Sequence, residues 1–370
     1  MPVLPACGLR FGRRLLYSAA SASVPRPIPI ALVFLALTAA AHAQSPAAAQ
    51  GRVWPPPPDP PRIRSLQSFS RSADLGWKPS LWQRFKQWAR SERDLSWMSR
   101  PLAVAVNSRD EMIIADAGLA EVKIFNPRTK SVKTIHGYKD YKFGSVVSVA
   151  VDDQDNLYVA DSAAGRVLKY SRDGKFLAFI GGPEGAFKLP AAVAFNPANR
   201  LLYVLDTARP RVFAYSLDGA TRKLEFGAAG AADGQFNLPS ALAIDRQGRL
   251  YVNDSLNFRL QVFTPEGKLI TRFGESGDGS GFFNRPKGVA VDSEGHIYVA
   301  EALFATIQIF DLEGRYLLSF GDFGGGPGQF YLPAGVAIDG QNRIFVADPY
   351  YRRVQVFQYL PAPASPRGQP

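Results

Sequence analysis

The chain has 370 residues, of which 46% are hydrophobic and 20% are charged, and its formal net charge is +11. This composition is that of a folded globular protein and excludes an intrinsically disordered chain. The charge lies near one end, because residues 1–43 carry +4, residues 44–100 carry +6 and residues 101–370 carry +1. A nucleic-acid binder concentrates positive charge on its binding face, so we expect no nucleic-acid partner.

Residues 1–43 have the pattern of a secretory signal peptide. Four arginines precede an apolar run, Ile28 to Ala41, and the small-residue sequence AHA ends at Ala43. We expect cleavage near Ala43 and a periplasmic or extracellular protein, with an uncleaved membrane anchor as the alternative. The one cysteine, Cys7, would be lost on cleavage, which leaves no thiol for a disulfide or a metal site.

Two proline-rich segments flank the central part of the chain. Residues 44–61 are interpreted as a linker, in which VWPPPPDPP predicts an extended polyproline spacer. A docking site for an aromatic groove is the alternative interpretation of this run. Residues 361–370 are expected to be a disordered tail.

Residues 62–100 are predicted to hold one strand, Arg62 to Phe69, and then one amphipathic helix that starts near Lys78. The expected apolar face of this helix consists of Leu81, Trp82, Phe85, Trp88 and Ala89. Basic residues occupy the other faces. We expect the helix to pack as a strut against the rest of the protein. Contact of Trp82, Phe85 and Trp88 with a membrane surface or a partner protein is the alternative.

Residues 101–360 contain six repeats. Each has an apolar segment that ends in an acidic residue, and these residues recur every 45 to 48 positions: Asp116, Asp161, Asp206, Asp254, Glu301 and Asp348. Each period predicts four short strands separated by turn residues, as in LPSALAID, GRLYVND, FRLQVFT and GKLITRFG between Leu238 and Gly274. Strand-only repeats of this length predict a propeller, here with six blades of four antiparallel strands.

The sixth repeat ends after its third strand. Pro361 and Pro363 follow Leu360 directly, and proline cannot join a sheet ladder. The segment Arg62 to Phe69, RIRSLQSF, resembles the fourth strands of other repeats, such as GKLITRF. We therefore predict that this N-terminal strand completes the last blade and covers an otherwise free sheet edge.

The repeated pattern LPxGVAVD, GxIYVAD and RIQVF resembles the NHL repeat family, whose members form six-bladed β-propellers. The resemblance extends from Arg62 to Leu360, is best in the fourth to sixth repeats, and implies an all-β fold. The first repeat departs most, with Glu121 at the fifth position after the acidic residue. Four other repeats carry arginine there: Arg166, Arg211, Arg259 and Arg353. The fifth repeat has Thr306.

The six acidic residues could be a ring of metal ligands or structural hydrogen-bond acceptors. Blade geometry spreads one acidic residue per blade around the ring. A short carboxylate at a strand end accepts hydrogen bonds from the turn that follows it. We therefore interpret these residues as structural, and we interpret the arginines five positions later as partners of these carboxylates or of their neighbours.

The sequence predicts no catalytic, cofactor-binding or metal-binding residue. Beyond residue 43 only two histidines remain, His136 and His296, and they are far apart in the sequence. No nucleophile elbow, phosphate-binding loop or zinc-protease motif is present. The run DDQDN, from Asp152, lacks the glycine and the glutamate of a calcium loop and fits a hairpin turn.

The loops between second and third strands are expected on the same rim as the connections between blades. Aromatic residues and arginines gather in these loops, and both are enriched at protein interfaces. The predicted partner-binding residues are Arg209, Arg211, Asn257, Phe258, Arg259, Phe304, Tyr350, Tyr351 and Arg352.

Together these features predict an exported, non-catalytic binding scaffold that recognises a protein, a peptide or a cell-envelope ligand through one loop face. The sequence does not indicate the oligomeric state. The rival interpretation comes from the resemblance: similar six-bladed propellers include calcium-dependent lactonase-type hydrolases and zinc-dependent lyases with metal in the central channel. The ligand clusters of such enzymes are not apparent in this sequence.

Overall fold

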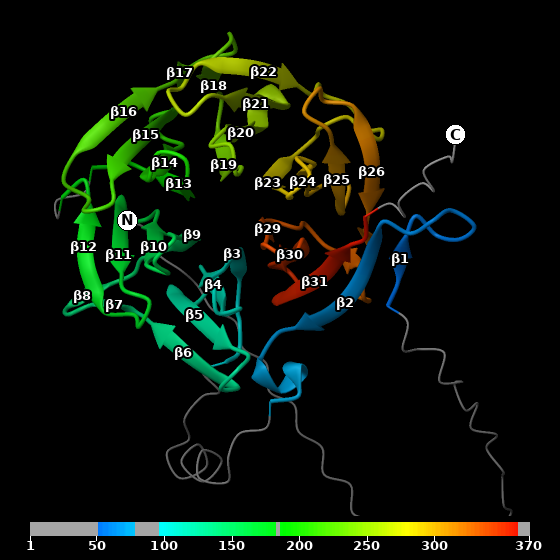
Figure 1. Ribbon diagram of the computed structural model, residues 1–370, viewed down its shortest axis with the longest axis horizontal. Helices are drawn as coiled ribbons and strands as arrows, with labels where there is room; N and C mark the ends of the chain where they lie inside the picture. The colour runs from blue at the N-terminus through cyan, green and yellow to red at the C-terminus, as the bar shows by residue number, and fades with distance from the viewer. Residues whose placement is uncertain (1–50, 78–95, 183–185, 362–370) are drawn as a thin grey trace, which may run out of the picture. The chain divides into compact units, whose positions relative to one another are not determined.

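The repeats fold into the six-bladed β-propeller that the sequence predicts (Figure 1). The computed structural model describes residues 51–77, 96–182 and 186–361. Six antiparallel sheets are arranged in a ring, and the first strand of each repeat is the innermost (Figure 1). Their second strands are almost wholly buried, which suits their β-branched and aromatic side chains.

The first three blades each begin with an inner strand at the channel and add their strands outward. The first blade contains β3 (Pro101–Val106), β4 (Met112–Asp116), β5 (Glu121–Asn126) and β6 (Ser131–Ile135). The second contains β9 (Val146–Val151), β10 (Leu157–Asp161), β11 (Arg166–Tyr170) and β12 (Phe176–Ile180). The third contains β13 (Pro190–Asn196), β14 (Leu201–Asp206), β15 (Arg211–Ser216) and β16 (Arg222–Phe226).

The remaining blades follow the same order. The fourth contains β19 (Pro239–Ile244), β20 (Leu250–Asp254), β21 (Arg259–Phe263) and β22 (Leu269–Phe273). The fifth contains β23 (Pro286–Val291), β24 (Ile297–Glu301), β25 (Thr306–Phe310) and β26 (Tyr316–Phe320). The sixth contains β29 (Val336–Ile338), β30 (Arg343–Asp348), β31 (Arg353–Tyr359), β2 (Ile63–Phe69) and β1 (Val53–Trp54).

Short elements fill several of the connections. Three two-stranded pairs are β7 (Gly137–Tyr138) with β8 (Tyr141–Lys142), β17 (Ala228–Ala229) with β18 (Gln235–Phe236), and β27 (Asp322–Phe323) with β28 (Gln329–Phe330). Helical structure in the described ranges is limited to two 3-10 segments, η2 (Ser72–Leu75) and η3 (Ser255–Asn257), and neither could cross a membrane. The predicted signal peptide, the helix predicted from Lys78 and residues 362–370 lie outside the described residues.

The last blade takes its outer strands from the N-terminal side of the propeller. Strand β2 pairs antiparallel with β31, with Ile63 opposite Tyr359 and Phe69 opposite Val354. The blade therefore joins residues from both ends of the described chain, which Figure 1 shows as the blue and red strands lying side by side.

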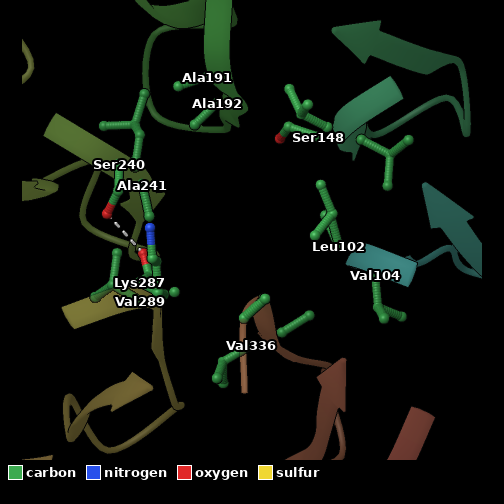
Figure 2. A pocket seen from close by; sticks show the side chains of 18 of the residues that line it. Leu102, Val104, Ser148, Ala191, Ala192, Ser240, Ala241, Lys287, Val289 and Val336 are labelled. Carbon is green, nitrogen blue, oxygen red and sulfur yellow. Dashed lines mark hydrogen bonds between the residues drawn. The ribbon is translucent and has the colours of Figure 1, made fainter. Parts of the chain in front are cut away.

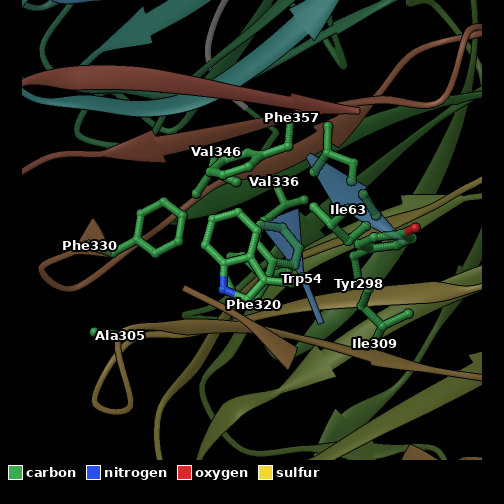
Figure 3. Close-up of a cluster of buried hydrophobic side chains, with 14 residues drawn as sticks. Trp54, Ile63, Tyr298, Ala305, Ile309, Phe320, Phe330, Val336, Val346 and Phe357 are labelled. Atoms are coloured by element: carbon green, nitrogen blue, oxygen red, sulfur yellow. The ribbon is translucent and has the colours of Figure 1, made fainter. Parts of the chain in front are cut away.

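The proline-rich segment begins differently from the predicted spacer. Val53 and Trp54 form β1 on the outer edge of β2, with Trp54 opposite Ile63. The Trp54 side chain is only 7% exposed and packs with Phe320 of the fifth blade and Phe357 of the sixth (Figure 3). Burial of so large an apolar side chain explains why the segment adheres to the propeller at this point.

The hydrophobic core is divided into clusters that fill the spaces between neighbouring blades. In the cluster of Figure 3, Tyr298 and Ile309 of the fifth blade meet Val346 and Phe357 of the sixth. Each blade thus depends on its neighbours, as in other repeat proteins. The hairpins that connect third and fourth strands end in Gly174, Gly219, Gly267 and Gly314, whose φ angles of 75° to 80° favour glycine.

Candidate functional site

The inner strands enclose a channel of about 1640 Å³ (Figure 2). Their sequences align residue by residue, with alanine at the fifth position of each and valine or leucine at the fourth. The wall consequently consists mainly of small and branched apolar side chains, and Figure 2 shows Leu102, Val104, Val289 and Val336 among them. Among the described residues that line the channel, none is Asp, Glu or His.

Four cations line one end of this channel: Arg100, Arg285, Lys287 and Arg352. We call this end, with the residues that surround it, the channel mouth. Arg100, Arg285 and Arg352 are exposed, whereas Lys287 is half-buried on the wall (Figure 2). Within the described residues, none of the four side chains has an ion-pair partner or accepts or donates a hydrogen bond.

Lys287 is the charged residue nearest the interior of the channel. It stands at the second position of β23, where the other inner strands carry Leu102, Val147, Ala191, Ser240 and Ala334. Its backbone carbonyl accepts hydrogen bonds from the Ser240 hydroxyl at 2.9 Å and from the Asn253 amide at 3.1 Å. Burial and the nearby Arg285 guanidinium lower the pKa of the Lys287 ammonium.

The mouth also exposes apolar side chains. The residue before the proline that opens an inner strand is Leu189 in the third blade and Leu238 in the fourth, and the same place holds Arg285 in the fifth. Leu238 is 50% exposed. The third, fourth and sixth blades therefore present leucines at this place, the first and fifth present arginines, and Lys287 and Arg352 complete the set of cations.

The six repeated acidic residues are structural, as the sequence predicts. All of them are fully buried. The Asp116 carboxylate accepts backbone hydrogen bonds from Ser99 at 2.7 Å and Arg100 at 2.8 Å. Glu301 does the same for Asn284 and Arg285 in the fifth blade. These carboxylates hold the loops that carry the cations of the mouth, and backbone donors occupy them.

The predicted pairing of arginine with the acidic residue occurs in two blades. Arg259 Nε lies 2.9 Å from Asp254, and Arg353 Nε lies 3.0 Å from Asp348. Arg211 pairs with Glu225 instead. The Arg166 guanidinium lies over the Tyr141 ring, 4.9 Å from its centroid.

The predicted partner-binding residues separate into buried and exposed groups. Arg259 is 6% exposed and also donates to the backbone oxygens of Ala232 and Gln235, so its prediction as a surface anchor is wrong. Asn257 donates to Asp254, and Phe258 is partly buried against the core. The sequence suggests two roles for Arg259, a surface anchor and a partner of the acidic residue, and the structure shows the pairing with the buried Asp254.

The remaining predicted residues lie on the rim. Arg209 pairs with Asp206, Arg211 is exposed beside its partner, and Phe304 is half-buried. Tyr350 is 63% exposed and contacts Tyr351 and Tyr331, with ring centroids 5.3 and 4.2 Å away. Tyr350 and Arg352 are the members of the predicted set that line the channel mouth.

Sequence reasoning missed Arg100, Arg285 and Lys287. A signal for Lys287 was present, because alignment of the six inner strands shows it as the one charged residue at the second position. The arginines carry no comparable signal, since an arginine before a strand is ordinary at a protein surface.

Neither histidine belongs to this site. His296 Nδ1 lies 2.8 Å from Asp292 in a hairpin turn, and this hydrogen bond raises the pKa of the imidazole. His136 Nδ1 lies 3.1 Å from Glu121, between the first two blades. In the run from Asp152, the carboxylate accepts hydrogen bonds from Asn156 and Tyr158, as a hairpin turn requires.

The donor set of the channel does not fit a divalent metal ion. Calcium takes six to eight oxygen ligands, usually with several carboxylates, and zinc takes about four imidazole, thiolate or carboxylate ligands. The described wall offers neither, and nowhere in the described ranges do three or more His, Cys, Asp or Glu side chains group to hold a metal.

Comparisons with known proteins agree with the fold. The family model for the SMP-30/gluconolactonase/LRE-like region matches residues 183–276, and the NHL repeat model matches residues 283–310. Comparison of the sequence with curated proteins gives no significant match.

Several solved structures are similar in fold. The virginiamycin B lyase from Staphylococcus aureus shares 12% identity at a TM-score of 0.53, covering 71% of this chain and 96% of the lyase. A gluconolactonase from Xanthomonas campestris shares 16% at 0.54, covering 71% and 87%. An auxiliary nutrient binding protein from Bacteroides thetaiotaomicron shares 13% at 0.55, covering 71% and 69%. At these identities the likeness concerns the fold alone. The repeat pattern, the six-bladed ring and the two family matches together support an NHL-repeat β-propeller family for this chain.

Proposed function

We propose that this chain is an exported, non-catalytic binding propeller that recognises a protein, a peptide or a cell-envelope ligand at the channel mouth and the rim around it. The observation that carries the proposal is the set of side chains at the channel mouth. It contains cations without ion-pair partners and exposed apolar side chains, and the described lining residues include no carboxylate or imidazole. Such a surface can bind a ligand, but its described lining lacks the carboxylates and imidazoles from which a metal site for hydrolysis is built.

The basic residues of the two rims differ in their ion pairing, and this difference favours the channel mouth as the binding surface. On the opposite rim, arginines in the hairpin turns are held by neighbouring carboxylates: Arg249 by Asp245, and Arg315 by Asp311 and Glu313. At the mouth, Arg285 and Arg352 have no such partner among the described residues, and Tyr350 stands exposed beside Arg352. Aromatic residues and arginines that are free to be desolvated are typical anchors of binding interfaces.

The test is enrichment of partners from cell-envelope extracts on the immobilised chain, with quantitative mass spectrometry. Tyr350→Ala combined with Arg352→Ala should reduce capture of the enriched partner by roughly tenfold or more. The matched control, Tyr316→Ala combined with Arg315→Ala, changes the same residue types next to the opposite rim and should leave capture within about twofold. Loss of capture with the control pair alone would contradict the proposal.

A metal-dependent hydrolase or lyase with its site in the channel is the second candidate. The observation that favours it is the match of residues 183–276 to the SMP-30/gluconolactonase/LRE-like region. This candidate needs a bound metal in the purified protein, so metal content separates the two.

A further inference from the structure

We infer that the channel mouth binds an amphipathic oxyanion, a molecule that carries a phosphate or carboxylate head on an apolar body. This inference rests on the proposed function, because it names the ligand chemistry of the same site. It is carried by three features: the cluster of cations, the exposed leucines among them, and the volume and wall of the channel below.

The cations define the head of the ligand. Arg100, Arg285, Lys287 and Arg352 converge on one end of one cavity, and no carboxylate among the described residues lines that cavity. Glu301, whose charge acts on Lys287 and favours its ammonium form, is fully buried and accepts backbone hydrogen bonds from Asn284 and Arg285. The mouth therefore attracts anions, and guanidinium groups bind phosphate and carboxylate in bidentate fashion.

Lys287 fixes how far the head can enter. Its side chain stands one strand position below the proline that opens β23, whereas the three arginines lie at the entrance. Burial disfavours its unpaired charge, so an anion that pairs with Lys287 removes a cost that the ligand-free protein carries. Electrostatic attraction of an anion to the protein surface would not require a cation below the entrance of the channel.

The apolar part of the mouth defines the body of the ligand. Leu189, Leu238 and Leu332, from the third, fourth and sixth blades, are exposed at the mouth among the cations. Covering these side chains is favourable by the hydrophobic effect. A purely inorganic anion would leave them exposed, and a polyanion such as a nucleic acid would place charge against them.

The channel gives the apolar body room. Its volume of about 1640 Å³ exceeds the roughly 300–1,000 Å³ of typical small-molecule pockets. A six-residue inner strand spans five steps of about 3.3 Å, which gives a depth of roughly 17 Å. The channel therefore has room for the apolar body of a ligand whose head stays at the cations.

The experiment is isothermal titration calorimetry of the folded chain with dodecyl phosphate, below the concentration at which the probe forms micelles. Inorganic phosphate tests the head alone, and dodecyl maltoside tests the same tail on a neutral head. We expect one dodecyl phosphate per chain, inorganic phosphate at least tenfold weaker, and no competition by dodecyl maltoside. Dodecanoate should bind in the same place as dodecyl phosphate and compete with it.

Three variants locate the site. Lys287→Met keeps an unbranched apolar side chain and removes the charge, and it should weaken dodecyl phosphate binding tenfold or more. Lys287→Arg should retain binding. Lys268→Met makes the same substitution as the first variant in an exposed hairpin on the opposite rim and should change nothing. Circular dichroism melting of each variant shows that it is folded before it is titrated.

Two results would overturn the inference. Equal binding of dodecyl phosphate and dodecyl maltoside, with Lys287→Met unaffected, would show that the tail alone associates with the protein. Equal binding of inorganic and dodecyl phosphate would show a site for free anions only. Failure of this inference would leave the proposed function standing if the Tyr350 and Arg352 variant still loses its envelope partner, so the two failures are distinguishable.

Discussion

The Trp54 indole packs edge-on against the Phe357 ring, with centroids 5.9 Å apart, and so joins the first described strand to the last. Strand β2 lies between these two segments in the sheet, pairing with β1 on one edge and with β31 on the other. The sixth blade is thereby assembled from residues that are distant in sequence. Its stability should depend on the N-terminal strands as much as on the repeat itself.

Substitution of Trp54 by alanine should destabilise the propeller by about 3–5 kcal/mol, because it removes a buried aromatic side chain between two blades. Leu66→Ala on the neighbouring β2 is the control, since Leu66 is 49% exposed and should change stability by less than about 0.5 kcal/mol. Urea denaturation followed by circular dichroism measures both. Deletion of all residues up to Phe69 should cost more than Trp54→Ala, because it also removes β2. A deletion variant with the same melting temperature as the full-length chain would contradict this account.

Arg259→Ala should destabilise the fold by about 3–5 kcal/mol, because it leaves the fully buried Asp254 without its charged partner. Arg211→Ala is the matched control. It occupies the equivalent place in the third blade, but its partner Glu225 and its own side chain are partly exposed, so we expect about 1 kcal/mol or less. Thermal unfolding of the two variants under the same conditions measures the difference in their stability. Similar, small losses for both would mean that Arg259 is an exposed side chain after all.

The His296–Asp292 pair should make stability depend on pH. The hydrogen bond to Asp292 raises the pKa of His296 above 6.5, and the same pair lowers the pKa of Asp292 below 3.8. The histidine contribution is complete below pH 6.5 and is lost as pH rises through its folded pKa, and the aspartate contribution is present above pH 3.8. The pair is therefore strongest between about pH 4 and pH 6.5.

His296→Asn tests this pH dependence with a natural precedent, because Asn156 occupies the same turn position in the second blade and bonds Asp152. The variant should lose about 1 kcal/mol relative to the original protein at pH 5 and clearly less at pH 9. Urea titrations at the two pH values provide the comparison. A loss of equal size at both would indicate that the imidazole is not charged in the folded state at pH 5.

The fold was predictable because the information is repeated. Each blade carries the same buried strand and the same terminal carboxylate, and four blades carry the same hairpin glycine, so weak local signals add over the copies. Trp54 was not predictable, because a polyproline run normally indicates a spacer, and only the completed ring creates the space between Phe320 and Phe357 that the indole fills.

The candidate site was less predictable than the fold for a geometric reason. Lys287, Arg100 and Arg352 belong to three different blades and meet only when the ring closes. In the sequence each is a basic residue near a proline or a turn, which is ordinary at a protein surface. The exposed Tyr350 and Arg352 could be predicted from residue type and loop position, whereas Arg259 has the same signature and points inward to Asp254.

Metal content tests the central claim, a binding propeller without hydrolytic chemistry in its channel, most directly. Native mass spectrometry of the purified chain should show no stoichiometric metal, and EDTA should leave the melting temperature within about one degree, because a metal that binds the folded state would stabilise it. One calcium or zinc ion per chain, with a fall in melting temperature on chelation, would contradict the account and support the hydrolase or lyase.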